Sequence, residues 1–568
     1  MTLGVTPADV RARVPLWVWD LLALALLTAI GLWVWRLQWS QVGGAVPAGS
    51  PFWACARDHR LYGPDAEMWA SNAWAVHLGR WEDVDVHRLP TWCLLTAAML
   101  QFVPNVALAG HLVNHLLQVA LPLVLYGAGL AMCGRAAAFG AAVNVALLSE
   151  LVMAAETSSA DPAIAIALPL ALLGGALAAR HPRLSALGGA LAALGALAHL
   201  STLGDLAPGL VLAWGTARPG RDRWVSAAGF LGGALLLMGL IGSHYPFVTG
   251  TQLVDALAEG VAPNAVERGG TGGPALRDRA LAVVGMGFPT APRNAVLFTL
   301  KQIRPRWMPW DLALTLPWIG ALGLFLPGRA EGASGSGART LPWSGASRVV
   351  NQLAPGVALL GGLAPMIAFA AVRSPDRYSV PFLPVTMLLG IRGAASLLAG
   401  VEFAVRRGLL RLFPSRSLPG WPLALLTLAL GLGWAKGVWD PRWRLLVGSP
   451  PPNDGGAATI GKAILDHFPP GGRVATTNRG AAAFAGRKQC MLRAPMTVDG
   501  SALALEQECP GEGDIPYVVS IPAGRDDRTE ARKGMDAWVE RTFPVVEKVQ
   551  NSEVTATVYA VPRSQGPS

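Results

Sequence analysis

Acidic side chains able to take part in proton transfer occur in two polar segments between apolar runs of the chain. The first segment reads GPDAEMW and carries Asp65 and Glu67, and the second reads ETSSADP and carries Glu156 and Asp161. A carboxylate held next to a hydroxyl group can take its proton as that oxygen attacks. Carboxylate oxygens are also ligands for divalent metal ions, a role we consider for Glu156 and Asp161.

Basic and aromatic side chains suited to phosphate binding occur in segments of the same kind. A guanidinium group can bind phosphate oxygens in a bidentate manner and stabilise a phosphate that leaves during a reaction. The candidates are Arg88, His244, Tyr245, Lys301, Arg304, Arg306, Arg377 and Tyr378.

The elements that must position these residues are predicted to be membrane helices. Of the 568 residues, 52% are hydrophobic and 14% are charged, whereas soluble domains carry about 25% charged residues. Apolar runs of about 20 residues, enough to cross a hydrocarbon core, recur along the chain. The net charge of +10 is spread over the loops, so nucleic acid is not an expected partner.

Hydropathy predicts eleven spans, with the N-terminus inside and the C-terminus outside. The short inner loops carry arginine, as the orientation rule for membrane proteins requires. The predicted spans are 16–35, 106–132, 136–152, 163–179, the two arms of a hairpin at 184–217, then 224–242, 309–326, 350–372, 378–398 and 421–439. With this topology, all of the candidate residues lie on the outer side.

Two long outer loops are predicted at 38–105 and 243–307. The runs 91–102 and 280–288 within them are apolar but too short to cross, which is typical of interfacial or re-entrant helices. The hairpin arm 205–217 is also short, at about 20 Å if helical.

Residues 441–568 form a polar segment after the membrane part, which ends near 440. Strands are predicted at 473–477, 517–522 and 554–561, and helices at 457–468 and 530–543. This mixture indicates a small α/β domain in the outer compartment. Cys490 and Cys509 are either a disulfide, which that compartment permits, or two free thiols.

Four motifs in order resemble those of the GT-C glycosyltransferases in the protein mannosyltransferase and aminoarabinose transferase superfamily. They are GPDAE at 63–67, RLP at 88–90, SSADP at 158–162 and RYSVPFLP at 377–384. The likeness covers residues 1 to about 440. The acidic pair of that family is interrupted here by Ala66, which leaves open whether Asp65 or Glu67 is the base. The second proline of its basic-Pro-Pro segment is missing, with Leu89 between Arg88 and Pro90.

The resemblance implies a GT-C fold and a polyprenyl-phosphate sugar donor, with a lipid, protein or glycan as acceptor. It further implies membrane lipid as a partner, a multi-pass location in a bacterial inner membrane, and a reaction on the outer face. Asp65 is then the expected base. Arg377, with Lys301, Arg304 or Arg306, is expected to bind the phosphate.

Other interpretations stay open at this point. Asp65 and Asp161 could cap helices, and the His111–His115 pair suits polar packing better than metal binding. A lipid or polysaccharide transporter would need a polar path through the bundle, where the sequence has mostly Ala, Leu, Gly and Val. A non-catalytic assembly protein on the same scaffold is the other alternative.

Overall fold

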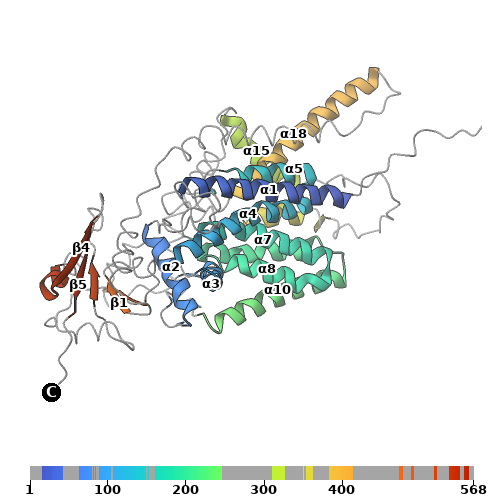
Figure 1. Ribbon diagram of the computed structural model, residues 1–568. Helices are drawn as coiled ribbons and strands as arrows, with labels where there is room; N and C mark the ends of the chain where they lie inside the picture. Colours follow the sequence, from blue (N-terminus) through green and yellow to red (C-terminus); the bar gives the residue numbers. More distant parts are fainter. Residues whose placement is uncertain are drawn as a thin grey trace, which may run out of the picture.

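A computed structural model of the chain gives a bundle of helices followed by a small β-sheet (Figure 1). The structure describes these residues: 16–42, 63–79, 81, 84, 88–103, 106–148, 151, 160–245, 310–325, 349–350, 353–362, 383–412, 473–476, 488–491, 517–520, 537–550 and 555–561.

Four of the described helices are long and apolar enough to cross a membrane. They lie in α1 (Leu16–Val42), α4 (Val106–Met132), α7 (Asp161–Arg180) and α10 (Arg221–Gly242). Shorter apolar helices occur in α15 (Trp310–Phe325), in α18 (Leu383–Leu412) and at Leu353–Gly362. The prediction of a mostly helical chain with helices able to span a membrane is therefore confirmed, while the number of eleven spans stays a prediction.

The boundaries of α4, α7 and α10 follow the hydropathy closely, but two other expectations are wrong. Helix α5 (Arg135–Ala146) ends well before residue 152. Helix α18 continues to Leu412, so Arg406, Arg407 and Arg411 belong to a helix and not to a loop. The expected span at 421–439 lies outside the described residues.

The predicted hairpin is present as two short helices. Helix α8 (Ser185–Ala196) is joined to α9 (Leu206–Gly215) through the 3-10 helix η4 (Leu200–Asp205). The ten residues of α9 rise about 15 Å, half of a hydrocarbon core of about 30 Å.

Glycines allow the helices around this hairpin to pack with their backbones in contact. A Cβ atom on Gly189 of α8 would meet the carbonyl oxygen of Phe230 in α10, and a Cβ atom on Gly175 of α7 would meet that of Gly209 in α9. Such close approach is typical of membrane helices, where dispersion contacts between backbones replace the hydrophobic effect. Glycine is therefore required at these contacts.

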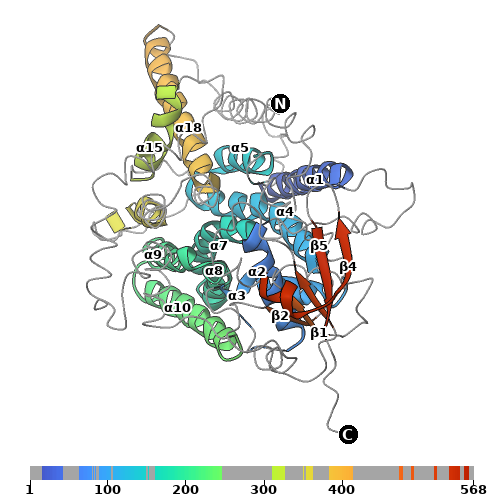
Figure 2. The ribbon, with the colours of Figure 1, turned by 90° about the vertical axis from the view of Figure 1, so that its left-hand side faces the viewer.

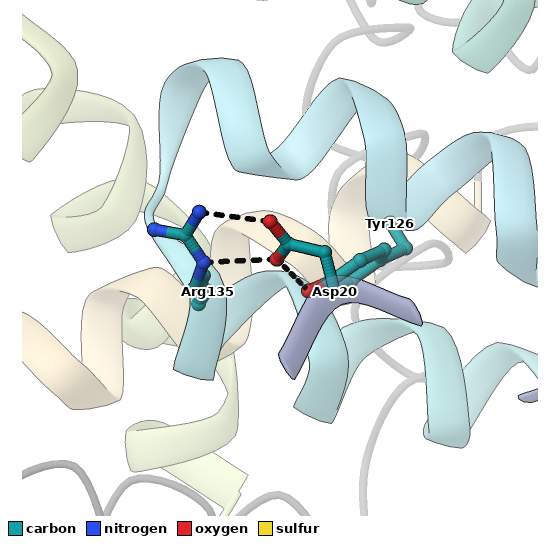
Figure 3. Close-up of polar contacts among 3 residues, drawn as sticks. All are labelled: Asp20, Tyr126 and Arg135. Carbon is teal, nitrogen blue, oxygen red and sulfur yellow. Dashed lines mark hydrogen bonds and ion pairs between the residues drawn. The ribbon is translucent and has the colours of Figure 1, made fainter. Parts of the chain in front are cut away.

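A polar contact fastens the first part of α1 to the rest of the bundle (Figure 3). The Arg135 guanidinium donates through Nε and Nη2 to the two carboxylate oxygens of Asp20, each at 2.8 Å, and the Tyr126 hydroxyl donates to Asp20 at 2.8 Å. Because Tyr126 is near the end of α4 and Arg135 begins α5, this contact places the beginning of α1 beside the α4–α5 turn.

We call the end of the bundle that contains Arg135, Arg180 and Arg221 the basic end. Helices α4 and α7 run in parallel, since their first turns pack in one hydrophobic cluster (Ala109 with Ala163) and Gly127 faces Leu173 further along both helices. The Ser226 hydroxyl donates to the carbonyl of Ala178 at 2.9 Å, so α10 begins where α7 ends. Helices α2 (Gly63–His77) and α3 (Pro90–Met99) lie at the opposite end, as Figures 1 and 2 show.

The C-terminal part contains a mixed five-stranded sheet of order β2-β1-β3-β5-β4. Strand β1 (Arg473–Thr476) pairs in parallel with β2 (Lys488–Met491) and β3 (Tyr517–Ser520), while β5 (Thr555–Ala560) pairs antiparallel with β3 and β4 (Val545–Gln550). The strands predicted at β1, β3 and β5 are confirmed, and β2 and β4 were not expected. In Figures 1 and 2 the sheet lies beyond the α2–α3 end of the bundle.

Candidate functional site

The beginning of α3 rests on the tip of the α8–α9 hairpin. Pro90 starts the helix, and the Thr91 backbone N–H donates to the carbonyl of Leu197 at 3.1 Å. The Thr91 hydroxyl donates to the carbonyl of Leu194 at 2.7 Å. These bonds bring the RLP segment onto the inner part of the bundle, although more than a hundred residues separate it from the hairpin.

Tyr245 joins three segments at this end of the molecule, and we call this contact the Tyr245 junction. Its hydroxyl donates to the carbonyl of Arg88 at 2.8 Å and accepts from the side-chain amide of Asn72 in α2 at 3.2 Å. Tyr245 is fully buried and follows the end of α10. A buried hydroxyl with both a donor and an acceptor partner fixes the relative positions of the segments that it joins.

Aromatic rings surround the junction. The Arg88 guanidinium carbon lies 5.4 Å from the centre of the Trp69 ring, a cation–π distance. The Trp81 ring contacts those of His244 and Tyr245 at centroid distances of 6.2 and 6.3 Å. The predicted residues Arg88, His244 and Tyr245 thus lie in one neighbourhood, although their roles remain predictions.

The predicted acids Asp65 and Glu67 lie in the first turns of α2, and the structure describes the backbone but not the side chains there. Helix α2 begins at Gly63, so the helix start expected at Gly63–Asp65 is confirmed, while the capping role of the Asp65 side chain stays a prediction. Residues four apart share a helix face, so Asp65 is on the face of α2 that carries Trp69. Helix α2 therefore carries both the candidate base and Trp69, the ring that contacts Arg88.

Asp161 is the first residue of α7, and the N-cap is Ala160, so the interpretation of Asp161 as the N-cap is wrong. A carboxylate in the first helical turn is still favoured by the helix dipole. Ala160, Ala163 and Ile164 pack in the same hydrophobic cluster as Trp69 and Tyr245. The remaining candidates lie outside the described residues; these are Glu156, Lys301, Arg304, Arg306, Arg377 and Tyr378.

A buried polar stripe on α4 lies beside the cluster. His111, Asn114, His115 and Gln118 are spaced to share one helix face, and all are at most 6% exposed. Asn114 accepts from the Trp92 indole at 2.6 Å, and His115 stacks on Trp35 with ring centres 5.3 Å apart. The contacts of Asn114 and His115 support the packing interpretation of the His111–His115 pair. Within the described ranges, no three potential metal ligands come together.

Asp205, at the tip of the hairpin, is a residue that the search for motifs missed. Its side chain is 2% exposed, Oδ1 has no hydrogen-bond partner in the described part of the chain, and it makes no cap bond to α9. A lone acid in the turn of an otherwise apolar hairpin was the sequence signal that could have found it.

Tyr245→Phe is expected to lower the free energy of unfolding by about 2 kcal/mol, because the hydroxyl makes two hydrogen bonds and each is typically worth about 1 kcal/mol. The sugar transfer expected from the sequence resemblance should fall about tenfold, because the carbonyl of Arg88 loses its hydrogen bond and the guanidinium shifts. The control is Tyr126→Phe, which removes a hydroxyl bond of equal length at the basic end. It should cost similar stability, measured by thermal unfolding, without changing activity. Equal activity losses in both variants would contradict a local role for Tyr245.

Comparison with solved structures shows an overall likeness to two membrane proteins. ArnT from Cupriavidus metallidurans bound to undecaprenyl phosphate matches with a TM-score of 0.52 and 15% identity, over 96% of this chain and 99% of that chain. The Archaeoglobus fulgidus oligosaccharyltransferase tethered with an acceptor peptide containing the NVT sequon matches with a TM-score of 0.50 and 14% identity, over 96% of this chain and 75% of that chain. A complex of that oligosaccharyltransferase with Zn and sulfate gives a TM-score of 0.50 at 16% identity, over 95% of this chain and 74% of that chain. No protein-family model and no curated protein sequence matches the chain.

Proposed function

We propose that this chain, which has the fold of the GT-C glycosyltransferases, transfers a sugar from a polyprenyl-phosphate donor to an acceptor at the membrane surface. The observation that carries the proposal is the Tyr245 junction. It holds Arg88 at the end of the bundle where α2 presents the segment containing Asp65. A carboxylate and a guanidinium at one end of such a bundle are the two groups that this reaction needs.

In the proposed reaction, the carboxylate of Asp65, or that of Glu67, takes the proton from an acceptor hydroxyl. The hydroxyl oxygen forms a bond to the anomeric carbon as the bond from that carbon to the phosphate oxygen breaks. The polyprenyl phosphate leaves with the bonding electron pair. Arg88 and Arg377, with Lys301, Arg304 or Arg306, stabilise the added negative charge.

The similar structures support the class of substrate. One holds undecaprenyl phosphate and the other an acceptor peptide. A lipid-linked donor also fits a chain whose helices α1, α4, α7 and α10 are long enough to span a bilayer, since such a donor is confined to the membrane. We propose a bacterial inner membrane as the location, with the N-terminus inside and with the site and residues 441–568 outside. Glu156 and Asp161 are the acids proposed to hold a divalent metal ion if the transfer needs one.

The distribution of buried acids favours transfer over transport. A proton- or ion-coupled transporter keeps interacting carboxylates near the middle of the bilayer. Among the described residues, Asp205 is the one buried acidic side chain. The described interior thus has a single acid, whereas a proton- or ion-coupled transport path would need several interacting carboxylates.

The test is transfer of radiolabel from polyprenyl-phosphate sugars by the purified protein in lipid nanodiscs, with extracted glycolipids, glycoproteins and glycans as acceptors. Mass spectrometry of the same fractions from a deletion strain identifies the natural acceptor as the fraction that loses one sugar. We expect transfer by the wild type and a glycan missing from the deletion strain. An unchanged glycan profile together with no transfer would reject the proposal and favour a non-catalytic assembly role.

A further inference from the structure

The α8–α9 hairpin ends inside the bundle, below its α2–α3 end. Its helices have 12 and 10 residues, whereas α10 beside them has 22 residues and rises about 33 Å. The chain turns through η4 at this level, and the beginning of α3 covers the turn through the two Thr91 bonds. The turn is thus enclosed by the helices around it and by the RLP segment above it.

The contacts of the hairpin define the depth of Asp205. Gly209 packs against Ala171 of α7, and α7 and α9 run in the same direction because both end near the beginning of α10. Asp205 is one turn before Gly209, which places it level with residues 167–168 of α7. That level is about 10 Å deeper than Asp161 at the start of the same helix.

Three elements meet beside Asp205. Gly362, the last residue of the helix Leu353–Gly362, packs against Leu168 of α7 and Pro208 of α9. The chain after Gly362 leads to the candidate residues Arg377 and Tyr378. Arg88 lies three residues before Thr91, which binds the hairpin from above. Asp205 is therefore placed close to the segment that carries Arg88, a candidate phosphate-binding residue.

The surroundings of Asp205 give its carboxyl no structural role. It does not cap α9, and Oδ1 has no hydrogen-bond partner among the residues that the structure describes. A buried polar group without a partner destabilises a fold. Groups of this kind that persist inside membrane proteins mark functional sites, where the ligand supplies the missing partner.

We propose that Asp205 is a substrate-binding residue that accepts hydrogen bonds from hydroxyl groups of the donor sugar; this inference rests on the proposed function. Hydroxyl groups are the partners that an acceptor-only carboxylate lacks, whereas a phosphate would be repelled by its charge. The proposed acceptor approaches from the side of Asp65, at the α2–α3 end, whereas Asp205 lies about 10 Å deeper in the bundle than Asp161. We therefore assign Asp205 to the donor. Asp205 contributes to the choice of sugar and does not take part in proton transfer.

The test compares Asp205→Asn and Asp205→Leu with the wild type in the nanodisc assay. We expect kcat/KM for the sugar donor to fall about 10- to 100-fold, mostly through a higher KM, as for the loss of a hydrogen bond to a charged group. Both variants should fold and should unfold at a temperature equal to or above that of the wild type, because a buried unpaired carboxyl is removed. Thr96→Val, which removes another buried, unpartnered oxygen, should also keep or raise stability but leave the KM unchanged.

A binding measurement with bare polyprenyl phosphate shows whether Asp205 binds the sugar or the lipid phosphate of the donor. Asp205→Asn should bind the bare lipid with wild-type affinity and the sugar-bearing lipid more weakly. An unchanged donor KM in both variants, while the wild type transfers sugar, would overturn the role of Asp205 and leave the proposed function intact. An equal loss of affinity for both lipids would overturn it too. If the wild type transfers no sugar, the proposed function itself fails.

Discussion

Asp65→Asn is expected to lower the rate of sugar transfer by about 10²- to 10⁴-fold, because asparagine cannot take the proton of the attacking hydroxyl. The loss should appear in kcat, with the KM for the donor little changed, since the substitution keeps the size of the side chain and removes an interaction of the transition state. Initial rates of radiolabel transfer in nanodiscs measure both constants.

Two further variants make this result specific. Asp222→Asn is the control, because it also removes a carboxylate from the first turn of a helix, α10, but at the basic end. It should cause the same loss of helix-dipole stabilisation and leave the transfer rate unchanged. Glu67→Gln identifies the base. If it abolishes transfer while Asp65→Asn does not, Glu67 takes the proton, and if both variants transfer at the wild-type rate, neither acid is the base.

Gly189→Leu is expected to destabilise the fold by about 3 kcal/mol or to prevent folding, the largest effect on stability that we foresee. A Cβ atom on Gly189 would meet the backbone carbonyl of Phe230, and backbone cannot move aside as a flexible side chain does. The fraction of protein that elutes as a single species in detergent, together with its unfolding temperature, reports the change.

Gly232→Leu is the matched control for this substitution. Gly232 lies in α10, two residues after Phe230, and a Cβ atom there has no neighbour within 4 Å. Leucine favours helix over glycine, so this variant should be as stable as the wild type or more so. Equal behaviour of the two variants would show that the close contact between α8 and α10 does not determine stability.

The sequence predicted the elements whose apolar runs have clear ends. Helices α4 and α7 begin and end within two residues of the expected positions, since polar residues or arginine flank them. Helix α18 was misjudged because arginines were assigned to a loop, although a helix that leaves the hydrocarbon core can carry them. Strand β2 (Lys488–Met491) was missed because its four residues show no alternation of apolar and polar side chains.

The sequence also suggested that Arg88, His244 and Tyr245 lie on one side of the membrane, but it could not show that they touch. The bond from the Tyr245 hydroxyl to the carbonyl of Arg88 joins residues 157 positions apart. A bond to a backbone carbonyl also leaves no pattern in the residue types. Asp205 stands out in the sequence as the one acid of an apolar hairpin, but its burial comes from the packing of η4 against α7, α8 and α9 and could not be predicted.

The glycine contacts have a mechanical consequence. Helix backbones touch without side chains between them at Gly175–Gly209 and Gly189–Phe230. If one helix slid by one residue, a side chain would replace the glycine at the contact and collide with the carbonyl of the other helix. Helices α7, α8, α9 and α10 should therefore behave as one stiff block. An opening that admits the proposed lipid-linked donor would then come from movement of the other helices against that block.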